Sequence, residues 1–477
     1  MKTYITLLAL LLCVAIAPRV PTRTHAAAHT RGVHPLATTL SGVPMIVQSG
    51  TLTPPADEQC LAATKPILGI AVHCYSPQQI RNAYDVTPLL NAGFTGRGQT
   101  IVIVNSFGSP TIERDLVAFD AAFHLPDPPS FKVVAPLGTV AFDPASSDQV
   151  NWALETTLDV EWAHAIAPEA NIVLLTSPVS ETEGVPGMPE FLSIEQYALD
   201  HRLGQIITQS WGTAENDLFD PAGQQIFTDF ERMYRRARSE HVTVLAASGD
   251  SGATSPDLEF NLFPFRSVLY PASSPFVTAV GGTSLEADAN GNYQSEVVWN
   301  DFTGSTGGGV SRQFREPSYQ NVLPRETQTL LGGRRGMPDI AFNGDPLTGL
   351  TLFESFFGPP GGGFVIGIGG TSAGSPQWAG LVAIANQRAG RPLGFLNRKL
   401  YRLASQGRLA TALHDITIGD NSFFGVAGFS AARGWDATTG WGTPGATELV
   451  LALVDEPDDD AAADEGEKGP GLRLARQ

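Results

Sequence analysis

Short apolar runs alternate with helical segments from about residue 100 to residue 280, and this alternation restricts the fold more than any other feature of the chain. Residues 100–104 form an almost unbroken apolar run, typical of a strand buried on both faces of a sheet. Further strands are predicted at 171–175, 205–209, 242–247 and 277–280, and helices at 78–90, 112–123, 149–167, 192–200 and 225–239. Such alternation indicates βαβ units, so we predict an α/β fold with a mainly parallel central sheet and helices on both faces.

Ser372 lies in a Gly-rich stretch, residues 369–376, between an apolar run at 361–368 and an apolar helix predicted at 378–385. A serine at a helix N-terminus is close to unpaired backbone N–H groups and to the positive end of the helix dipole. These features suit a nucleophile whose transition state develops negative charge. On this stretch alone, a small-residue turn in which Ser or Thr caps the helix is the favoured interpretation.

A histidine base for Ser372 is hard to find. Four of the 9 His residues lie within the first 74 residues, and none lies in a His-Gly-Thr-His motif. The Gly-Thr-Ser-Ala-Gly stretch also matches the G-x-S-x-G elbow of α/β-hydrolases, which requires Asp or Glu and then His downstream. No Asp or Glu lies between Ser372 and His414, so chain order excludes that interpretation.

Carboxylates are the remaining candidates for a base. Glu155 and Asp159 are four residues apart on a predicted helix and therefore share one face. Repulsion between like charges raises the pKa of at least one member, which suits a general base beside a serine. The helix is apolar around much of its circumference, although a pair of this spacing considered alone usually marks a solvated face.

Asp250 follows a predicted strand, in the sequence Ser-Gly-Asp-Ser-Gly. A carboxylic acid held neutral in an apolar site can donate a hydrogen bond to a developing oxyanion. The alternative is an Asp that closes a turn with Gly and Ser, and the local sequence does not separate the two. Because sites in parallel sheets form at the carboxyl ends of strands, Ser210, Asp250 and Ser372 are expected at one edge.

The two ends of the chain differ in composition from its centre. Residues 1–28 combine Lys2, an apolar core and small residues, as in a signal peptide, which predicts a secreted protein. Residues 29–74 form a short leader that we expect to be poorly ordered, with order beginning near Tyr75. Cys60 and Cys74, left after signal removal, form one disulfide or two free thiols, and we favour the disulfide. Residues 455–477 are expected to be an acidic disordered tail.

The net charge of -18 and the lack of a basic stripe argue against nucleic-acid binding. The apolar core of the signal is too short for a confident membrane span, and no other segment qualifies. After signal removal we expect a monomer without a membrane span.

An ordered set of motifs resembles the sedolisin family, the serine-carboxyl peptidases, over roughly residues 75–454. Each match alone is weak, but the series is highly specific. The matching stretches are ETTLDVEWAHAIAPEA (155–170), SWG (210–212), ASGDSG (247–252), YPASSP (270–275), VGGT (280–283), GGGVS (307–311), PDIA (338–341) and the Ser372 stretch. The resemblance implies a subtilisin-like three-layer fold and an exported endopeptidase or tripeptidyl-peptidase that acts on protein or peptide substrates at acidic pH.

Carried over to these positions, the resemblance makes Ser372 the nucleophile and Glu155 the general base. It implies that Asp159 orients Glu155 and that Asp250 donates to the oxyanion together with the Ser372 backbone N–H. The resemblance also implies that two stretches flank the substrate and bind it as an added strand. These stretches are Ser210, Trp211 and Gly212, and Gly308 and Gly309.

The same resemblance implies one structural Ca²⁺. Its ligands would be the carboxylates of Asp415 and Asp436 and the carbonyls of Ile416, Ala432 and Gly434, an oxygen-only set that suits Ca²⁺. Without the resemblance, a Gly/Asp turn would be the favoured interpretation. Ala432 stands where the family often has Gly, so this ligand requires that Ala can adopt the backbone angles.

Two departures from the family pattern bear on function. The segment before Tyr75 is too short for the family's long folded propeptide, and Asn105 stands where an acid often extends the carboxylate chain. We expect a secreted serine-carboxyl endopeptidase that forms an acyl-enzyme on Ser372. The competing hypothesis is a catalytically inactive exported binding protein on the same fold.

Overall fold

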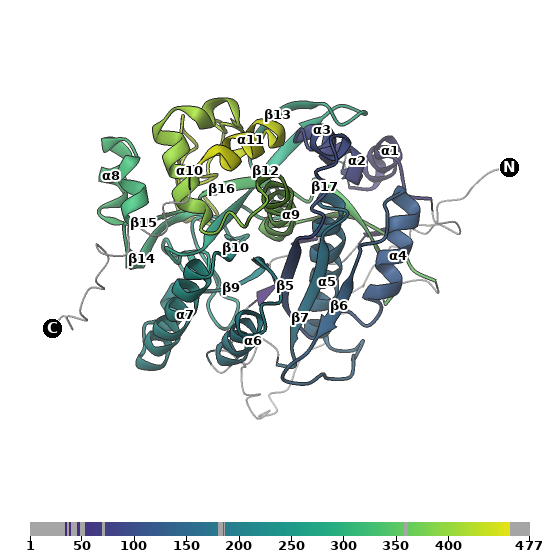
Figure 1. Cartoon of the computed structure of the whole chain (residues 1–477), viewed down its shortest axis with the longest axis horizontal. Helices are drawn as coiled ribbons and strands as arrows, with labels where there is room; N and C mark the ends of the chain where they lie inside the picture. Colours follow the sequence, from purple (N-terminus) through teal and green to yellow (C-terminus); the bar gives the residue numbers. More distant parts are fainter. Residues whose placement is uncertain are drawn as a thin grey trace, which may run out of the picture.

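The computed structural model describes residues 34–35, 38–39, 45–47, 53–68, 72–179, 185, 187–356 and 361–457 (Figure 1). The expected signal peptide at 1–28 and most of the expected tail, residues 458–477, lie outside these ranges. Within them, no helix is long and apolar enough to cross a membrane.

A large central sheet runs through the molecule. The described residues give it eight strands, with the order β13-β12-β10-β8-β5-β7-β6 and β16 paired to β12. Every neighbouring pair is parallel except β12 and β13. The strands are β5 (Thr100–Ser106), β6 (Phe131–Val134), β7 (Asn171–Ser177), β8 (Ile206–Gln209), β10 (Thr243–Ala247), β12 (Thr278–Ala287), β13 (Tyr293–Val298) and β16 (Ile340–Asn343).

Helices cover both faces of this sheet. One face packs against α4 (Ile112–Phe123), α5 (Ser147–Ile166), α9 (Thr371–Ala389), α10 (Leu396–Ser405) and α11 (Ala446–Asp455). The other packs against α6 (Met188–Asp200) and α7 (Pro221–Ser239), which lie side by side in Figure 1. Along β5, Ile101 and Ile103 join the first core, and Val102 and Val104 join the second. The predicted three-layer α/β fold is confirmed.

The ends of the two central helices follow from local sequence. Ser146 precedes α5, and its side chain accepts a hydrogen bond from the Gln149 N–H, as expected of an N-cap. Gly370 precedes α9 with φ 95°, and Gly390 ends it with φ 67°, backbone angles that favour glycine. Gly380 lets the two helices approach closely, since a Cβ there would lie 2.7 Å from the Cβ of Ile166.

A second sheet joins segments that are far apart in the chain. It contains β4 (His73–Tyr75), β17 (Thr348–Glu354) and β18 (Gly363–Gly369), with β2 (Thr38–Thr39) and β3 (Met45–Val47) paired to β18. Smaller elements are β1 (His34–Pro35), α1 (Asp57–Leu68), α2 (Pro77–Ala83), α3 (Thr87–Asn91), β9 (Trp211–Ala214), β11 (Leu269–Tyr270), β14 (Gly309–Arg315), α8 (Arg325–Leu331), β15 (Arg334–Met337), β19 (Leu413–His414) and β20 (Thr443–Pro444).

The expectation that order begins near Tyr75 is wrong, because α1 and three short strands lie before it. These strands have two or three residues and take their hydrogen bonds from existing sheet edges, so they leave no periodicity in the sequence. Cys60 and Cys74 form the expected disulfide, and the Asp57 carboxylate accepts a hydrogen bond from the Cys74 N–H at 2.9 Å. These contacts tie α1 to β4.

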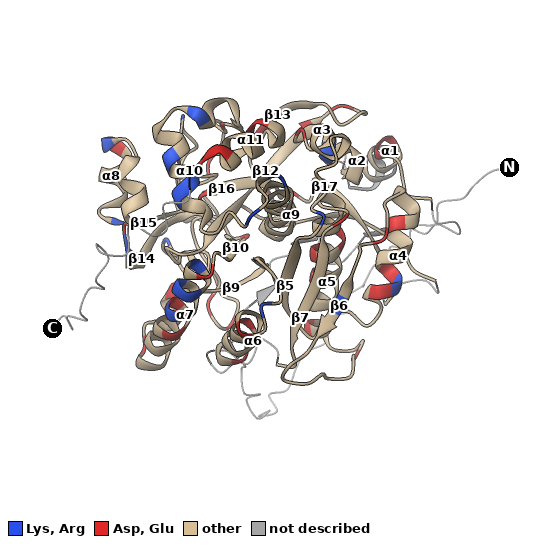
Figure 2. Cartoon of the chain, in the orientation of Figure 1, with Lys and Arg blue, Asp and Glu red and all other residues tan. Residues whose placement is uncertain are grey.

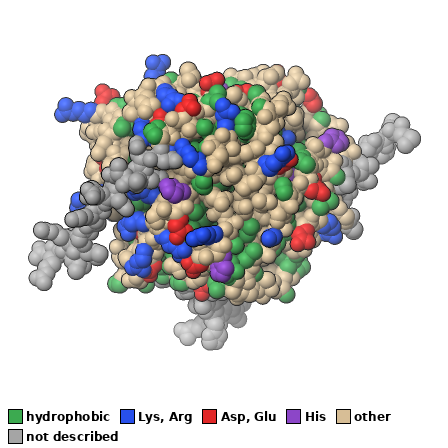
Figure 3. Space-filling model, in the orientation of Figure 1, with side chains coloured by type: hydrophobic (Ala, Val, Ile, Leu, Met, Phe, Trp, Pro, Cys, Tyr) green, Lys and Arg blue, Asp and Glu red, His purple; other side chains and the backbone are tan. Residues whose placement is uncertain are grey.

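The charged side chains on the surface are of both signs, whereas the interior contains a group of acidic side chains on α5. On the face shown in Figure 3, positive and negative side chains are interspersed rather than gathered into one stripe. Figure 2 shows acidic residues on α5, in the interior of the fold. Buried carboxyls are costly to ionise, so these acids point to a specialised site.

Candidate active site

Ser372 is the second residue of α9, three residues after the end of β18. Its side chain is fully buried, and among the described residues its Oγ has no hydrogen-bond partner. The first N–H groups of a helix lack intrahelical acceptors, so the start of α9 presents donors and a positive dipole end here. The structure therefore places this hydroxyl where negative charge would be stabilised.

Glu155 and Asp159 lie one turn apart on α5, and both side chains are fully buried. The solvated-face alternative is therefore wrong for this pair. Ser210 Oγ donates a hydrogen bond to Asp159 Oδ1 at 2.7 Å. Burial raises the pKa of Asp159 to about 7, while hydrogen bonds from Ser210 and Asn105 act in the opposite direction. At mildly acidic pH, Asp159 can therefore hold a proton.

Two hydrogen bonds at one end of β8 bring this carboxyl pair towards the start of α9. Thr208 on β8 shares a hydrogen bond with Ser375 Oγ at 2.8 Å, and Ser210, which follows the strand, contacts Asp159. Residues two apart on a strand project to the same side, about 6–7 Å from each other. Ser375 is about one helical turn from Ser372, so Asp159 and Ser372 lie at the same end of β8.

Asp250 follows β10 and contacts the residue beside Ser372. Its Oδ1 accepts hydrogen bonds from the backbone N–H and from the hydroxyl of Thr371, both at 2.8 Å. The Gly249 N–H donates to the same hydroxyl at 2.9 Å. Asp250 therefore does more than close a turn, because it connects the end of β10 to the first residue of α9.

The expected peptide-binding segments lie beside these residues. Trp211 packs its buried side chain against Phe191, with ring centroids 4.4 Å apart, so any substrate contact at Trp211 and Gly212 would be made by the β9 backbone. Gly308 allows a close approach, since a Cβ there would lie 2.2 Å from the Ala437 carbonyl oxygen.

Gly309, the first residue of β14, follows Gly308 and pairs with Met337. The backbone before it is attached to the Asp250 region, because the Gly307 N–H donates to the Gly249 carbonyl at 2.6 Å. This hydrogen bond connects the segment of Gly307, Gly308 and Gly309 to Gly249, the residue before Asp250.

The predicted calcium ligands lie on two segments that the fold brings together. The Gly434 N–H is 3.2 and 3.0 Å from the two carboxylate oxygens of Asp415, and the Ala432 N–H donates to Asp436 Oδ2 at 3.0 Å. Among the described residues, no group of three or more His, Cys, Asp or Glu side chains is placed to hold a metal. The predicted set of Ca²⁺ ligands would consist of the carboxylates of Asp415 and Asp436 and the carbonyls of Ile416, Ala432 and Gly434.

The chemistry of this donor set fits Ca²⁺, which takes carboxylate and backbone carbonyl oxygens. Ala432 is not among the residues with positive φ, whereas Gly434 has φ 79°. The backbone at Ala432 is therefore in a region that alanine adopts without strain, and its part as a carbonyl ligand stays a prediction.

Sequence reasoning missed Thr371, which holds Asp250 through two hydrogen bonds across 121 residues of chain. It also missed the contact between Thr208 and Ser375, 167 residues apart. The only signal for Thr371 is its position beside Ser372. Asn105, which was noted as a departure, is fully buried, and its Nδ2 donates to Thr156 Oγ1 at 3.2 Å.

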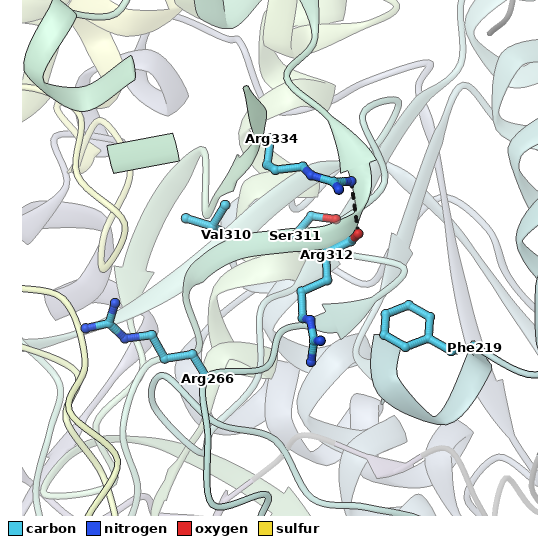
Figure 4. A pocket seen from close by; sticks show the side chains of 6 residues that line it. All are labelled: Phe219, Arg266, Val310, Ser311, Arg312 and Arg334. Atoms are coloured by element: carbon cyan, nitrogen blue, oxygen red, sulfur yellow. Dashed lines mark hydrogen bonds between the residues drawn. The ribbon is translucent and has the colours of Figure 1, made fainter. Parts of the chain in front are cut away.

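A hollow of about 500 Å³ lies beside β14, and Figure 4 shows the side chains around it. Its lining residues are Phe219, Arg266, Val310, Ser311, Arg312 and Arg334. Arg334 Nη1 donates to the Arg312 carbonyl oxygen at 3.0 Å, the contact dashed in Figure 4. None of the catalytic candidates lines this hollow, so we assign it no part in the chemistry.

Comparison with known proteins agrees with this architecture. Residues 138–403 match the model of the Subtilase family. Kumamolisin of Bacillus sp. (strain MN-32) is 36% identical over 387 residues, which cover 80% of this chain and 64% of that protein. Sedolisin of Pseudomonas sp. (strain 101) is 27% identical over 391 residues, which cover 80% of this chain and 62% of that protein.

A solved structure of Pseudomonas sedolisin (serine-carboxyl proteinase), complexed with two molecules of pseudo-iodotyrostatin, superposes with a TM-score of 0.66 at 26% identity. That match covers 80% of this chain and 98% of the other. The chain spans less than two thirds of the length of the two curated relatives it matches. The family model matches more than half of the chain, and the chain belongs to the subtilase family, in its sedolisin and kumamolisin group.

Proposed function

We propose that this chain is a secreted serine-carboxyl endopeptidase that hydrolyses peptide bonds of proteins at acidic pH. One observation carries the proposal: a fully buried carboxyl pair on α5 is connected, through the end of β8, to the turn of α9 that contains Ser372. A buried acid pair beside a buried serine hydroxyl supplies a base in a fold whose sequence lacks the His motif.

In the proposed mechanism, Ser372 Oγ attacks the carbonyl carbon of the substrate while Glu155 accepts its proton. Asp159, held by Ser210, orients Glu155 and shares that proton. The developing oxyanion receives hydrogen bonds from the Ser372 N–H and from the protonated carboxyl of Asp250. The proton then passes to the leaving amine, and water hydrolyses the acyl-enzyme to release the acid and restore Ser372.

Acidic pH suits this arrangement because two carboxyls must carry protons in the reaction. Asp250 can donate to an oxyanion only in its neutral form. Asp159, with a pKa raised to about 7 by burial, retains a proton to share with Glu155 in the acidic range. Rising pH would remove the proton that Asp159 holds, so we expect activity to fall towards neutrality.

The substrate would bind as an extended strand along β9, with the Gly308 and Gly309 segment on its other side. The buried Trp211 side chain supports a binding mode in which the β9 backbone, rather than its side chains, supplies most contacts. A Ca²⁺ held by Asp415, Ile416, Ala432, Gly434 and Asp436 would stabilise the nearby loop. Gly308 packs against Ala437, which follows Asp436, so this loop contacts the segment that we propose to flank the substrate.

The test is casein hydrolysis across pH about 3–5, the range in which carboxyl groups titrate. We expect Ser372→Ala and Glu155→Gln to lower kcat by about a thousandfold or more, because the nucleophile and its base act as a unit. Asp148→Asn is the matched control, since Asp148 lies in the first turn of the same helix and is partly exposed.

Full activity in Ser372→Ala, or a rate maximum above neutral pH that depends on a His, would contradict the mechanism. A folded wild-type chain that binds peptides but never cleaves them would favour the inactive binding protein instead.

A further inference from the structure

The hollow beside β14 adjoins the segments that we propose for substrate binding. Val310, which lines it, follows Gly309 directly on β14. Glu215, the residue after β9, joins the two strands here. Its buried carboxylate accepts hydrogen bonds from Ser311 Oγ at 2.6 Å and from the Arg312 N–H at 2.8 Å. A peptide that lies between β9 and Gly309 therefore reaches the hollow when it continues along β14.

A single aromatic ring also connects Gly309 with the charged wall of the hollow. A Cβ at Gly309 would lie 3.1 Å from the ring of Phe429. The Arg266 guanidinium, which lines the hollow, lies over the same ring at 4.3 Å from its centroid. The hollow is thus next to the segment that we propose to flank the substrate.

The hollow is some distance from the chemistry. The Gly307 N–H donates to the carbonyl of Gly249, the residue before Asp250. Val310 is three residues further along the chain, and three residues of extended strand cover about 10 Å. A substrate side chain in the hollow would therefore belong to a residue about three or more positions from the cleaved bond.

Three exposed arginines, Arg266, Arg312 and Arg334, surround the hollow. The Arg312 Cζ lies 5.8 Å from the centroid of the Phe219 ring and 5.7 Å from that of the Phe265 ring. Figure 4 shows the Arg312 guanidinium beside Phe219. A guanidinium that contacts aromatic rings in this way can still donate hydrogen bonds from its edge to an anion.

These arginines have no acidic partner. Within the part of the chain that the structure describes, none of the three forms an ion pair with an Asp or Glu side chain, and the side chains of Arg266 and Arg334 donate to backbone carbonyls. The Glu215 carboxylate is bound instead by Ser311 and by two backbone N–H groups. In a chain with a net charge of -18, such a group of guanidiniums suits an anionic ligand.

We propose that the hollow is a subsite for an acidic side chain of the peptide substrate, bound by Arg312 together with Arg266 and Arg334. The proposal rests on the proposed function, because the subsite selects among the substrates of that site. The forked donors of a guanidinium match the two oxygens of a carboxylate. The net charge of the chain repels acidic peptides, so a preference for them must come from these arginines.

The experiment compares kcat/KM for pairs of fluorogenic peptides that differ only in one Glu or Gln, placed in turn at each position on either side of the cleaved bond. At about pH 5 we expect Glu to exceed Gln by at least about fivefold at one position, because exposed ion pairs are individually weak and several act together here. This position should lie about three or more residues from the bond, as the strand geometry requires.

The pH dependence of this ratio shows whether charge is recognised. At about pH 3 the ratio should fall towards one, because a Glu side chain with a pKa of about 4.3 becomes neutral. A peptide with cysteic acid at the same position keeps its charge at both pH values, so its ratio to Gln should stay high. Ratios taken at one pH cancel the titration of the catalytic groups.

Variants of Arg312 test its part in the subsite. Arg312→Gln should lower the Glu/Gln ratio to about one third of the wild-type ratio or less, and Arg312→Lys, which keeps the charge, should retain more of it. Arg315→Gln is the matched control, because Arg315 is exposed on the same strand but does not line the hollow. It removes the same charge and should keep the wild-type ratio.

The outcomes separate the subsite from the proposed function. If wild type cleaves Glu and Gln peptides equally at about pH 5, or if Arg312→Gln keeps the wild-type ratio, the subsite is overturned and the proposed function stands. If wild type cleaves no peptide, the proposed function fails. The subsite then stands only if Ser372→Ala binds the Glu peptide at least about fivefold more tightly than the Gln peptide in fluorescence anisotropy.

Discussion

Asp159 is the residue through which pH would act on the site, and its neighbours set its proton affinity. Burial raises its pKa, and Ser210 and Asn105 oppose that effect by hydrogen bonding. An amide at 105 can donate to the carboxylate but cannot add a negative charge. This chain therefore has a shorter run of interacting carboxyls than one with an acid at that position.

We predict that Asn105→Asp shifts the acid limb of the pH profile of kcat/KM upwards by about one unit or more. The change replaces an amide donor with a like charge beside Asp159, and both effects favour the protonated carboxyl. A higher pH is then needed before the Glu155–Asp159 pair ionises and can act as a base. The profile is measured with a fluorogenic peptide.

Asn171→Asp provides the control for Asn105→Asp. Asn171 begins β7, and β7 pairs in parallel with β5, so the site is at the opposite end of the strands from Asn105. Its profile should match wild type. An unmoved acid limb in a fully active Asn105→Asp enzyme would show that Asn105 does not influence the base.

At the scale of elements, the close contact of α5 with α9 positions the base against the nucleophile. We predict that Gly380→Ala destabilises the protein by about 1–3 kcal/mol, because its Cβ would overlap Ile166 and force the helices apart. The loss is read from urea unfolding, and kcat should fall with it. The double variant Gly380→Ala, Ile166→Ala should recover part of the lost stability and part of the lost kcat. Losses that simply add in the double variant would exclude this steric explanation.

The long elements could be predicted from the sequence, and the short ones could not. The helix expected at 112–123 coincides with α4, and the helix at 149–167 differs from α5 by two residues or fewer at each end. Both have enough turns for an apolar pattern to be visible. The strand β9 has four residues and β11 has two, and their pairing depends on sheet edges that are distant in sequence.

The candidate site was predictable where chemistry and strand ends coincide. Ser210 and Asp250 follow β8 and β10, parallel strands whose carboxyl ends share an edge, whereas Ser372 follows β18, an antiparallel strand of the second sheet. The helix around Glu155 and Asp159 is apolar around much of its circumference, but the spacing of the pair considered alone favours a solvated face, so their burial is a finding of the structure. The hydrogen bonds of Asp250 with Thr371 could not be predicted, because they depend on how two loops meet across 121 residues.

The loop that contains Asp415 and Asp436 gives another prediction at this scale. If it binds Ca²⁺, a chelator should lower the melting temperature, because a ligand present at about 100 times its Kd stabilises the folded state by about 2.7 kcal/mol. The measurement is differential scanning calorimetry with and without chelator. Asp415→Asn should abolish the chelator effect, and a wild-type transition unchanged by chelation would count against the site.

Over the whole molecule, many buried carboxyls bind protons more tightly in the folded state than in the unfolded chain. Burial raises the pKa of Asp159, Glu231, Glu296 and Asp345 to about 7. In the unfolded chain such groups ionise near pH 4. Between about pH 4 and pH 7 the folded state therefore retains protons that the unfolded state has lost.

This difference predicts that stability is highest below about pH 4 and falls as the pH rises to 7, by about 1.4 kcal/mol per pH unit for each proton retained. Partly exposed Glu169, whose pKa is lowered by its hydrogen bond with Arg97, acts in the opposite direction, but solvent screens that pair because Arg97 is exposed. The melting temperature measured across this range should thus decrease towards neutrality. Glu231 lies on α7, on the opposite face of the sheet from α9, and Glu231→Gln removes one such carboxyl, so this variant should flatten the decrease. Stability that rises towards pH 7 in wild type would refute the prediction. A chain stabilised by buried, protonated acids is suited to the same acidic conditions that its proposed active site requires.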